Sequence, residues 1–254
     1  MYEPELAFAN ELADRADEIA LGIFGGEFEV RRKADQTPVT DADLAIEAMA
    51  REAITERFPG DAILGEEGGL AGEEGGREWV IDPIDGTKNF ADGIQIWGTL
   101  IALMDEGTPV VGVASAPALT ERYAAARGAG ARLNGEPIHV STSDDLGDAL
   151  LAFGGLEVWV DGDHRETFED LVQTVRRTRG IGDFWGHMLV ARGAADVMIE
   201  PELRIWDWAA LSPIVREAGG RMSTFAGGPL EDRGSVVTTN GPLHAEMLKR
   251  LAAV

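Results

Sequence analysis

The segment WVIDPIDGTKNF at residues 79–90 constrains the fold of this chain more than any other stretch. Its first three residues are apolar and predict a buried strand. Two carboxylates, Asp82 and Asp85, follow directly, so we expect them at the edge of a sheet, where α/β proteins usually bind their ligands. Residues 86–89 can then turn into a helix, whose free N–H groups favour an anion such as phosphate.

Two further acidic sites follow apolar runs in the same way. Glu66 comes after residues 62–64, and Asp207 opens a predicted helix behind residues 204–206. Carboxylates held together in a partly buried site repel one another unless a cation neutralises them. Oxygen ligands of this kind suit Mg²⁺, which keeps positions open for water and phosphate. The pattern therefore predicts a magnesium site used in phosphoryl transfer.

Apolar periodicity predicts a mixed α/β protein. One further helix begins with Thr40 or Asp41 as its N-cap and stops at Pro59-Gly60. Asn134-Gly135 predicts a hairpin turn. The other predicted helices are residues 5–24, 167–177, 184–192, 207–218 and 243–251. Pro213 is unfavourable inside the helix at 207–218, because a proline in mid-helix breaks or kinks it. The predicted strands are residues 79–81, 97–103, 110–114, 122–126, 150–153, 195–199 and 236–238.

A polar cluster at residues 141–145 is the predicted boundary between two lobes. The first, residues 1–141, is expected to be an α+β lobe that carries most of the metal ligands. The second, residues 142–254, is expected to be an α/β lobe that carries the substrate specificity and Asp207. Each half is expected to contain its own sheet, because strands come first and then alternate with helices.

Composition excludes several classes of function. The 254 residues include 22 Lys and Arg against 45 Asp and Glu, a formal charge of −23, and no cysteine. No disulfide, thiolate nucleophile or cysteine-ligated metal is therefore available. The acidic surplus argues against nucleic acids and anionic membranes as partners. No apolar run approaches the ~18 residues of a membrane span, and residues 1–5 lack the basic start of a secretory signal, so we expect a cytoplasmic protein.

Taken together, four motifs resemble those of the inositol monophosphatase family, the Mg²⁺-dependent, lithium-sensitive phosphatases. They are GEE at 65–67, WVIDPIDGTKNF at 79–90, WDWAA at 206–210 and EAGG at 217–220. VTDAD at 39–43 and LNG at 133–135 also fit the family pattern. The resemblance runs from about residue 5 to residue 250. It implies the layered αβαβα sandwich of that family, in the α/β (α+β) class, usually as a homodimer.

The resemblance also implies roles for individual residues. Two or three Mg²⁺ ions would be held by Glu66, Asp82, the carbonyl of Ile84, Asp85 and Asp207. Thr87, assisted by Glu66 and Asp43, would position and deprotonate the attacking water. The N–H groups of Gly86 and Thr87 would hold the phosphate. None of these residues is missing, which argues against the alternative of a non-catalytic protein that binds a metal or a phosphorylated metabolite.

Substrate specificity is expected in the second half. GDFWGH at 182–187 places Asp183 and His187 four residues apart on one helical face, and Glu200 follows a predicted strand. A pocket with these groups is anionic and partly aromatic, so it suits a leaving group that carries an amine and an imidazole. The motif GDFWGH and the segment from Glu200 to Asp207 are similar to motifs of the histidinol-phosphatase branch of the family. We therefore expect hydrolysis of the phosphate ester L-histidinol phosphate, in histidine biosynthesis.

Other interpretations remain open. An inositol-1-phosphate phosphatase or a broader sugar phosphatase would use the same catalytic residues. A nucleotide phosphatase of sulfur metabolism fits less well, because no basic groups stand where a second phosphate would sit. For the specificity residues, the alternative is structural: Asp183 caps its helix, and His187 bonds a neighbouring carbonyl.

Overall fold

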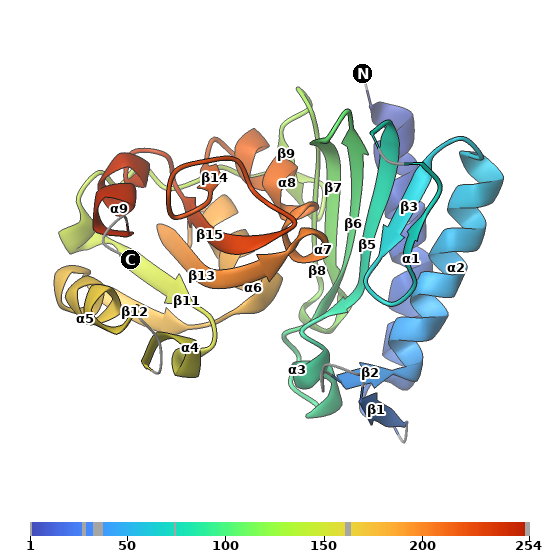
Figure 1. Ribbon diagram of the computed structural model, residues 1–254, viewed down its shortest axis with the longest axis horizontal. Coiled ribbons are helices and arrows are strands. Elements are labelled where there is room, and N and C mark those ends of the chain that lie inside the picture. Colours follow the sequence, from blue (N-terminus) through green and yellow to red (C-terminus); the bar gives the residue numbers. More distant parts are fainter. Residues whose placement is uncertain (1, 27–28, 33–37, 74, 161–163, 252–254) are drawn as a thin grey trace. The chain divides into compact units, whose positions relative to one another are not determined.

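The computed structural model describes residues 2–26, 29–32, 38–73, 75–160 and 164–251 (Figure 1). The chain divides into two compact units, Met1–Glu136 with Trp206–Ile214, and Pro137–Ile205 with Val215–Val254. Compared with the predicted lobes 1–141 and 142–254, the division falls a few residues earlier, and Asp207 belongs by its contacts to the first unit. Within the described ranges, no helix is both long and apolar enough to cross a bilayer.

The first unit is built on a mainly antiparallel sheet. Its described strands lie in the order β10-β9-β8-β7-β6-β5-β3-β4, and only β3 and β5 pair in parallel. Their bounds are β3 (Ala62–Gly65), β4 (Gly69–Ala71), β5 (Arg77–Asp85), β6 (Gly98–Asp105), β7 (Thr108–Ala116), β8 (Glu121–Ala126), β9 (Ala131–Leu133) and β10 (Glu136–Pro137). The other elements of this part are α1 (Glu3–Ile23), β1 (Val30–Arg32), β2 (Pro38–Thr40), α2 (Asp41–Arg57), α3 (Thr87–Ala91), the 3₁₀ turn η1 (Pro117–Leu119) and α7 (Ile205–Trp208).

Helices α1 and α2 cover one face of this sheet (Figure 1). Leu12 of α1 and Ile54 of α2 pack in one apolar cluster with Trp79 of β5 and with Val111 and Val113 of β7. The central strands β5, β6 and β7 are buried along almost their whole length, which agrees with the continuous apolar runs from which they were predicted. The strands expected at residues 79–81, 97–103, 110–114 and 122–126 are confirmed as β5, β6, β7 and β8, although β5 begins two residues before and ends four residues after its predicted range.

Local signals account for the ends of several elements. Thr40 is the N-cap of α2, and its side chain accepts hydrogen bonds from the N–H groups of Ala42 and Asp43. The Asp43 side chain accepts from the Thr40 N–H in return, which completes a capping box. Asn134 and Gly135 have φ values of +51° and +85°, as a type I′ turn requires, so the predicted hairpin between β9 and β10 is confirmed.

The second unit is a sheet with helices on both faces. The order of its described strands is β12-β11-β13-β15-β14, with parallel pairing among β12, β11 and β13. Leu151, Val197 and Ile199 pack against α5 and α9, whereas Ala152 and Met198 pack against α6 on the other face. The bounds are η2 (Leu146–Asp148), β11 (Leu150–Phe153), α4 (Leu156–Val160), α5 (Arg165–Thr174), β12 (Arg177–Gly180), α6 (Asp183–Ala191), β13 (Val197–Arg204), β14 (Arg221–Ser223), β15 (Arg233–Thr239) and α9 (His244–Leu251).

Two sequence predictions about helices are wrong in their extent. The helix expected at residues 207–218 is two helices, α7 and α8 (Leu211–Glu217). Pro213 is the third residue of α8, where a backbone N–H has no partner inside the helix, so the proline is tolerated. The helix expected at residues 167–177 ends at Thr174, and Arg177 already begins β12.

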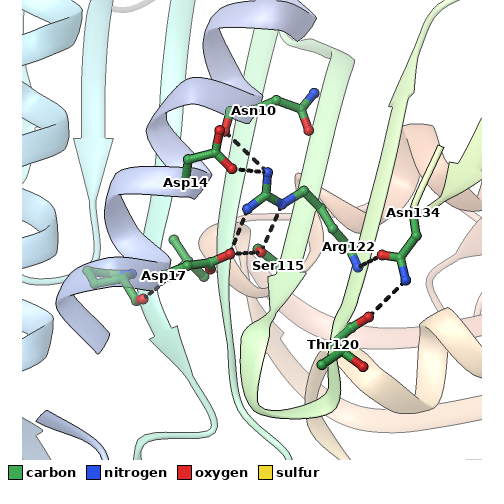
Figure 2. Close-up of polar contacts among 9 residues, drawn as sticks. Asn10, Asp14, Asp17, Ser115, Thr120, Arg122 and Asn134 are labelled. Atoms are coloured by element: carbon green, nitrogen blue, oxygen red, sulfur yellow. Dashed lines mark hydrogen bonds and ion pairs between the residues drawn. The ribbon is translucent and has the colours of Figure 1, made fainter. Parts of the chain in front are cut away.

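Arg122 of β8 connects the sheet of the first unit to α1 (Figure 2). Its guanidinium bonds Asp14 at 2.5 Å, Asp17 at 2.6 Å and the hydroxyl of Ser115 at 3.1 Å. Burial raises the pKa of Asp17, while the hydrogen bonds from Arg122 and Ser115 oppose the rise. The arginine therefore compensates a half-buried carboxylate and fixes α1 on the sheet that carries the acidic residues.

Candidate active site

A bulge at the end of β5 brings Asp82 and Asp85 to the same place. Residues three apart on a regular strand point to opposite faces. In β5, however, Asp82 pairs with Leu100 and Asp85 with Gly98, so three steps on β5 match two on β6. The extra residue falls at Pro83–Ile84, and Thr99 donates a hydrogen bond to the Pro83 carbonyl at 2.8 Å. The bulge turns both carboxylates toward one point.

Asp207 completes the acidic cluster from more than one hundred residues away. One carboxylate oxygen from each of Asp82, Asp85 and Asp207 can be chosen so that all three lie within 4.8 Å of one another. The backbone after Asp207 rests on β7 at Gly112, where an added Cβ would overlap the Ala210 carbonyl oxygen and come within 2.7 Å of Pro213 Cγ. A glycine in mid-strand can mark such a close approach of another backbone, and sequence reasoning missed this signal.

The cluster strongly disfavours ionised carboxylates in the absence of a cation. Burial, followed by the negative charges of Glu66, Asp85 and Asp207, raises the pKa of Asp82 well above its ordinary value. Asp82 is 2% exposed, and its Oδ1 is buried without a hydrogen-bond partner among the residues that the structure describes. An orphaned carboxylate oxygen among other carboxylates fits a bound divalent cation, because oxygen ligands are what Mg²⁺ and similar ions prefer.

A variant of Gly112 tests how Asp207 is placed. In Gly112→Ala, the new methyl group forces the Ala210 backbone away from β7, and Asp207 moves with it. We expect the free energy of unfolding to fall by about 1–3 kcal/mol, as for overpacked cores, and divalent-cation binding to weaken. Urea unfolding and calorimetric titration measure the two effects. Gly22→Ala is the control, since a Cβ there has no atom within 4 Å. Because alanine favours a helix more than glycine does, this variant should not lower the free energy of unfolding, and it should leave cation binding unchanged.

Glu66 lies in the loop between β3 and β4, near the cluster. Its N–H donates to the Ile81 carbonyl of β5 at 3.1 Å, so the loop is tied to the strand that carries Asp82. Its negative charge contributes to the raised pKa of both Asp82 and Asp43. The predicted site residues Glu66, Asp82 and Asp85 therefore occupy neighbouring strand ends of one sheet, as their positions after apolar runs suggested.

Thr87 begins α3 directly after the bulge. Its hydroxyl lies 2.9 Å from the Ile84 carbonyl oxygen and 3.5 Å from Asp43 Oδ1. Asp43 is fully buried, and burial, more than any other cause, raises its pKa. Gly86, the N-cap of α3, has a φ of +82°, which a residue with a side chain rarely adopts. The structure therefore groups Asp43, Ile84 and Thr87 beside the acidic cluster.

Two of the three predicted specificity residues, Asp183 and Glu200, lie at the carboxyl ends of the parallel strands of the second unit. Glu200 of β13 is 8% exposed, and its carboxylate lies against the backbone of Gly154, which follows β11. A Cβ on Gly154 would overlap this carboxylate, and one on Gly182 would come within 3.3 Å of Glu200 Oε1. Asp183 opens α6 with a φ of +56°, a strained conformation of the kind that clusters at ligand sites. Gly182, not Asp183, is the N-cap of α6.

His187 is in the interior of the second unit. Its ring is fully buried, and Nδ1 lies 2.7 Å from the hydroxyl of Thr238 on β15. Burial lowers the pKa of His187 to about 3, so the ring is neutral at ordinary pH. These contacts favour the structural interpretation, with a hydroxyl in place of the expected carbonyl. A substrate-binding role for His187 stays a prediction.

The chain belongs to the inositol monophosphatase family, whose model matches residues 1–254. It is 47% identical over 259 aligned positions to a histidinol-phosphatase of Mycobacterium tuberculosis, covering 100% of both chains. It is 44% identical to a histidinol-phosphatase of Streptomyces coelicolor, covering 97% of this chain and 96% of the other.

A solved structure has the same fold. An IMPase of Thermotoga maritima superposes with a TM-score of 0.89 at 30% identity, covering 98% of this chain and 97% of the other. The expected α/β fold of the inositol monophosphatase type is thus confirmed. Together with the family match, this makes the protein a phosphoric monoester hydrolase.

Proposed function

We propose that this phosphatase hydrolyses L-histidinol phosphate to L-histidinol and phosphate, a step of histidine biosynthesis. The observation that carries the substrate is the end-to-end similarity to histidinol-phosphatases described above. The buried Glu200 and the strained Asp183 support it, because two carboxylates at one edge of the second unit suit the amine and imidazole of this leaving group.

We propose Mg²⁺ as the resident cation of the acidic cluster. Asp82, Asp85 and Asp207 would hold it, together with Glu66 and the carbonyl of Ile84. When bound, the cation supplies charge neutralisation at the phosphate and lowers the pKa of water. The number of ions, two or three in the sequence prediction, remains part of this proposal.

The chain itself positions the nucleophile. We propose that the Thr87 hydroxyl, near both Asp43 and Ile84, takes a proton from the attacking water while its own proton passes to Asp43, so that the water attacks as hydroxide. The raised pKa of Asp43 makes this carboxylate a better proton acceptor than an exposed one. The N–H groups of Gly86 and Thr87 are proposed to hold the phosphate. Homodimer assembly and a cytoplasmic location also remain proposals.

Phosphate release from L-histidinol phosphate and from inositol 1-phosphate, measured side by side with Mg²⁺ and with EDTA, tests the assignment. We expect release that requires Mg²⁺ and a kcat/KM at least about 10-fold higher for histidinol phosphate, a difference of ~1.4 kcal/mol in the transition state. A preference for inositol 1-phosphate would keep the catalytic residues and overturn the substrate. The absence of release from both esters would overturn the substrate class.

Glu200→Gln separates recognition from catalysis. Losing a charged hydrogen-bond acceptor is worth about 1.5–3 kcal/mol, so we expect kcat/KM for histidinol phosphate to fall about 10- to 100-fold. Hydrolysis of p-nitrophenyl phosphate, whose leaving group has no amine, should change little. Glu202→Gln is the matched control, because Glu202 is 54% exposed and pairs with Arg233 on the surface. Equal losses on both esters would show that Glu200 does not recognise the amine.

A further inference from the structure

Glu47 of α2 is a buried carboxylate that the proposed mechanism does not use. It is 3% exposed. Its Oε2 accepts a hydrogen bond from the Glu67 N–H at 2.8 Å, and its Oε1 accepts from the Gly68 N–H at 2.7 Å and from Arg51 Nε at 2.8 Å. Three donors thus compensate the burial of one negative charge. Two of the three come from the loop that carries Glu66.

That loop is held from both sides. Gly65 pairs with Gly69 across the hairpin of β3 and β4, so Glu66, Glu67 and Gly68 form the turn. The Glu66 N–H is bonded to β5 through the Ile81 carbonyl. The next two N–H groups are bonded to α2 through Glu47, so Glu66 has a fixed backbone between the two elements.

The glycines of the loop make room for the Glu47 carboxyl group. A Cβ added to Gly65 would overlap the carboxyl carbon of Glu47, and a Cβ on Gly68 would come within 2.6 Å of its Oε1. Arg51, one turn further along α2, donates from Nη2 to the Gly69 carbonyl at 2.5 Å. The Glu47–Arg51 pair therefore packs closely against the loop on both sides of Glu66.

Helix α2 also carries Asp43, the carboxylate that lies beside Thr87. Asp43 precedes Glu47 by four residues, so both side chains lie on one face of the helix. Asp43 reaches the Thr87 hydroxyl, and Glu47 reaches the turn that carries Glu66. The same helical face thus contacts two separate parts of the candidate active site.

We propose that Glu47, with Arg51, is a positioning pair that fixes Glu66 for cation binding. The pair does not touch the cation itself. It acts by holding the backbone on the C-terminal side of Glu66, as residues behind a metal ligand orient that ligand. The inference rests on the proposed function in one respect, the role of Glu66 as a metal ligand.

Glu47→Gln is the sharpest test, because it keeps the shape and removes one acceptor oxygen. The amide carries two N–H donors where the carboxylate had an oxygen, so at least one of the three donors loses its partner. We expect the dissociation constant of Mg²⁺, measured by calorimetric titration of the metal-stripped protein, to rise about 10- to 100-fold. The Mg²⁺ concentration for half-maximal phosphate release should rise in parallel.

Matched variants separate this role from a merely structural one. Glu52→Gln removes an exposed carboxylate from the same helix and should bind Mg²⁺ as the wild type does. Arg51→Met keeps the bonds from the Glu67 and Gly68 N–H groups to Glu47 and removes the arginine's bonds to Glu47 and to the Gly69 carbonyl. Because both loop N–H bonds remain, we expect a smaller rise of the dissociation constant. This variant carries the test if Glu47→Gln does not fold. A structural role alone would lower the melting temperature in EDTA and leave the Mg²⁺ dissociation constant unchanged.

The outcomes distinguish the two proposals. If Glu47→Gln binds Mg²⁺ with wild-type affinity, the positioning role is overturned and the proposed metal centre stays intact. If only Arg51→Met folds, the same result in that variant has the same meaning. No Mg²⁺ binding by the wild-type protein overturns the metal centre, and the positioning role with it. Weakened binding in Glu47→Gln, with unchanged binding in Glu52→Gln, supports the proposal.

Discussion

Asp82→Asn is expected to abolish phosphate release and to leave the fold intact. The substitution keeps the size of the side chain and removes the charge from the most buried member of the acidic cluster. Divalent cations contribute several kcal/mol of transition-state stabilisation in such sites. A loss of ~4 kcal/mol corresponds to a decrease in kcat on the order of 10³-fold. Phosphate release at saturating substrate and Mg²⁺ measures it.

The same variant is expected to be at least as stable as the wild type in EDTA. Asp82 is held among negative charges that raise its pKa, and a neutral amide relieves that repulsion. Circular dichroism and thermal unfolding in EDTA test the fold. Asp144→Asn, at an exposed position, is the control and should keep full activity. Full activity in Asp82→Asn would contradict the assignment of the cluster as the metal site.

Removal of the cation is expected to make stability fall as pH rises. Burial and the neighbouring carboxylates raise the pKa of Asp82 in the folded protein well above 3.8, its ordinary value. A group with a raised pKa in the folded state stabilises the fold while it is protonated. Its contribution is therefore complete below about pH 3.8 and is lost as pH rises through the raised pKa. Added Mg²⁺ should restore stability, most strongly at the high end of this range.

Urea unfolding in EDTA over a series of pH values measures this effect. Asp17 and Asp43 also have raised pKa values and act in the same direction, so the wild type alone does not isolate Asp82. The difference between wild type and Asp82→Asn does isolate it. We expect that difference to grow in favour of the variant as pH rises, and to reverse when Mg²⁺ is present. A flat difference would show that Asp82 titrates normally.

Most of the strands and helices could be predicted from local patterns. The central strands of the first unit are continuous apolar runs, and the N-cap of α2 and the turn at residues 134–135 use strong local signals. The errors fall where a local pattern has more than one outcome. Residues 207–218 have the apolar spacing of a single helix, but Pro213 can occupy only a first turn, so the chain breaks after Trp208.

The candidate active site was predicted from residue types more than from geometry. Asp82, Asp85 and Asp207 were expected together, and they are together. Sequence reasoning missed Glu47, although it follows Asp43 by one helical turn, because a buried carboxylate is indistinguishable from an exposed one in a sequence. For the same reason, the pattern could not show that His187 is buried in the core.

Local sequence patterns specify which chemical groups are available and which strand ends they follow. The end of β5 is an example, because its carboxylates are followed directly by glycine and threonine. Contacts between neighbours in the chain are enough to place these groups together. Which of these groups meet depends on packing between distant segments of the chain. The bulge at Pro83–Ile84 depends on pairing with β6, and the place of Asp207 depends on Gly112 of β7. Both are contacts between distant residues, and local periodicity carries no information about which distant segment will pack there.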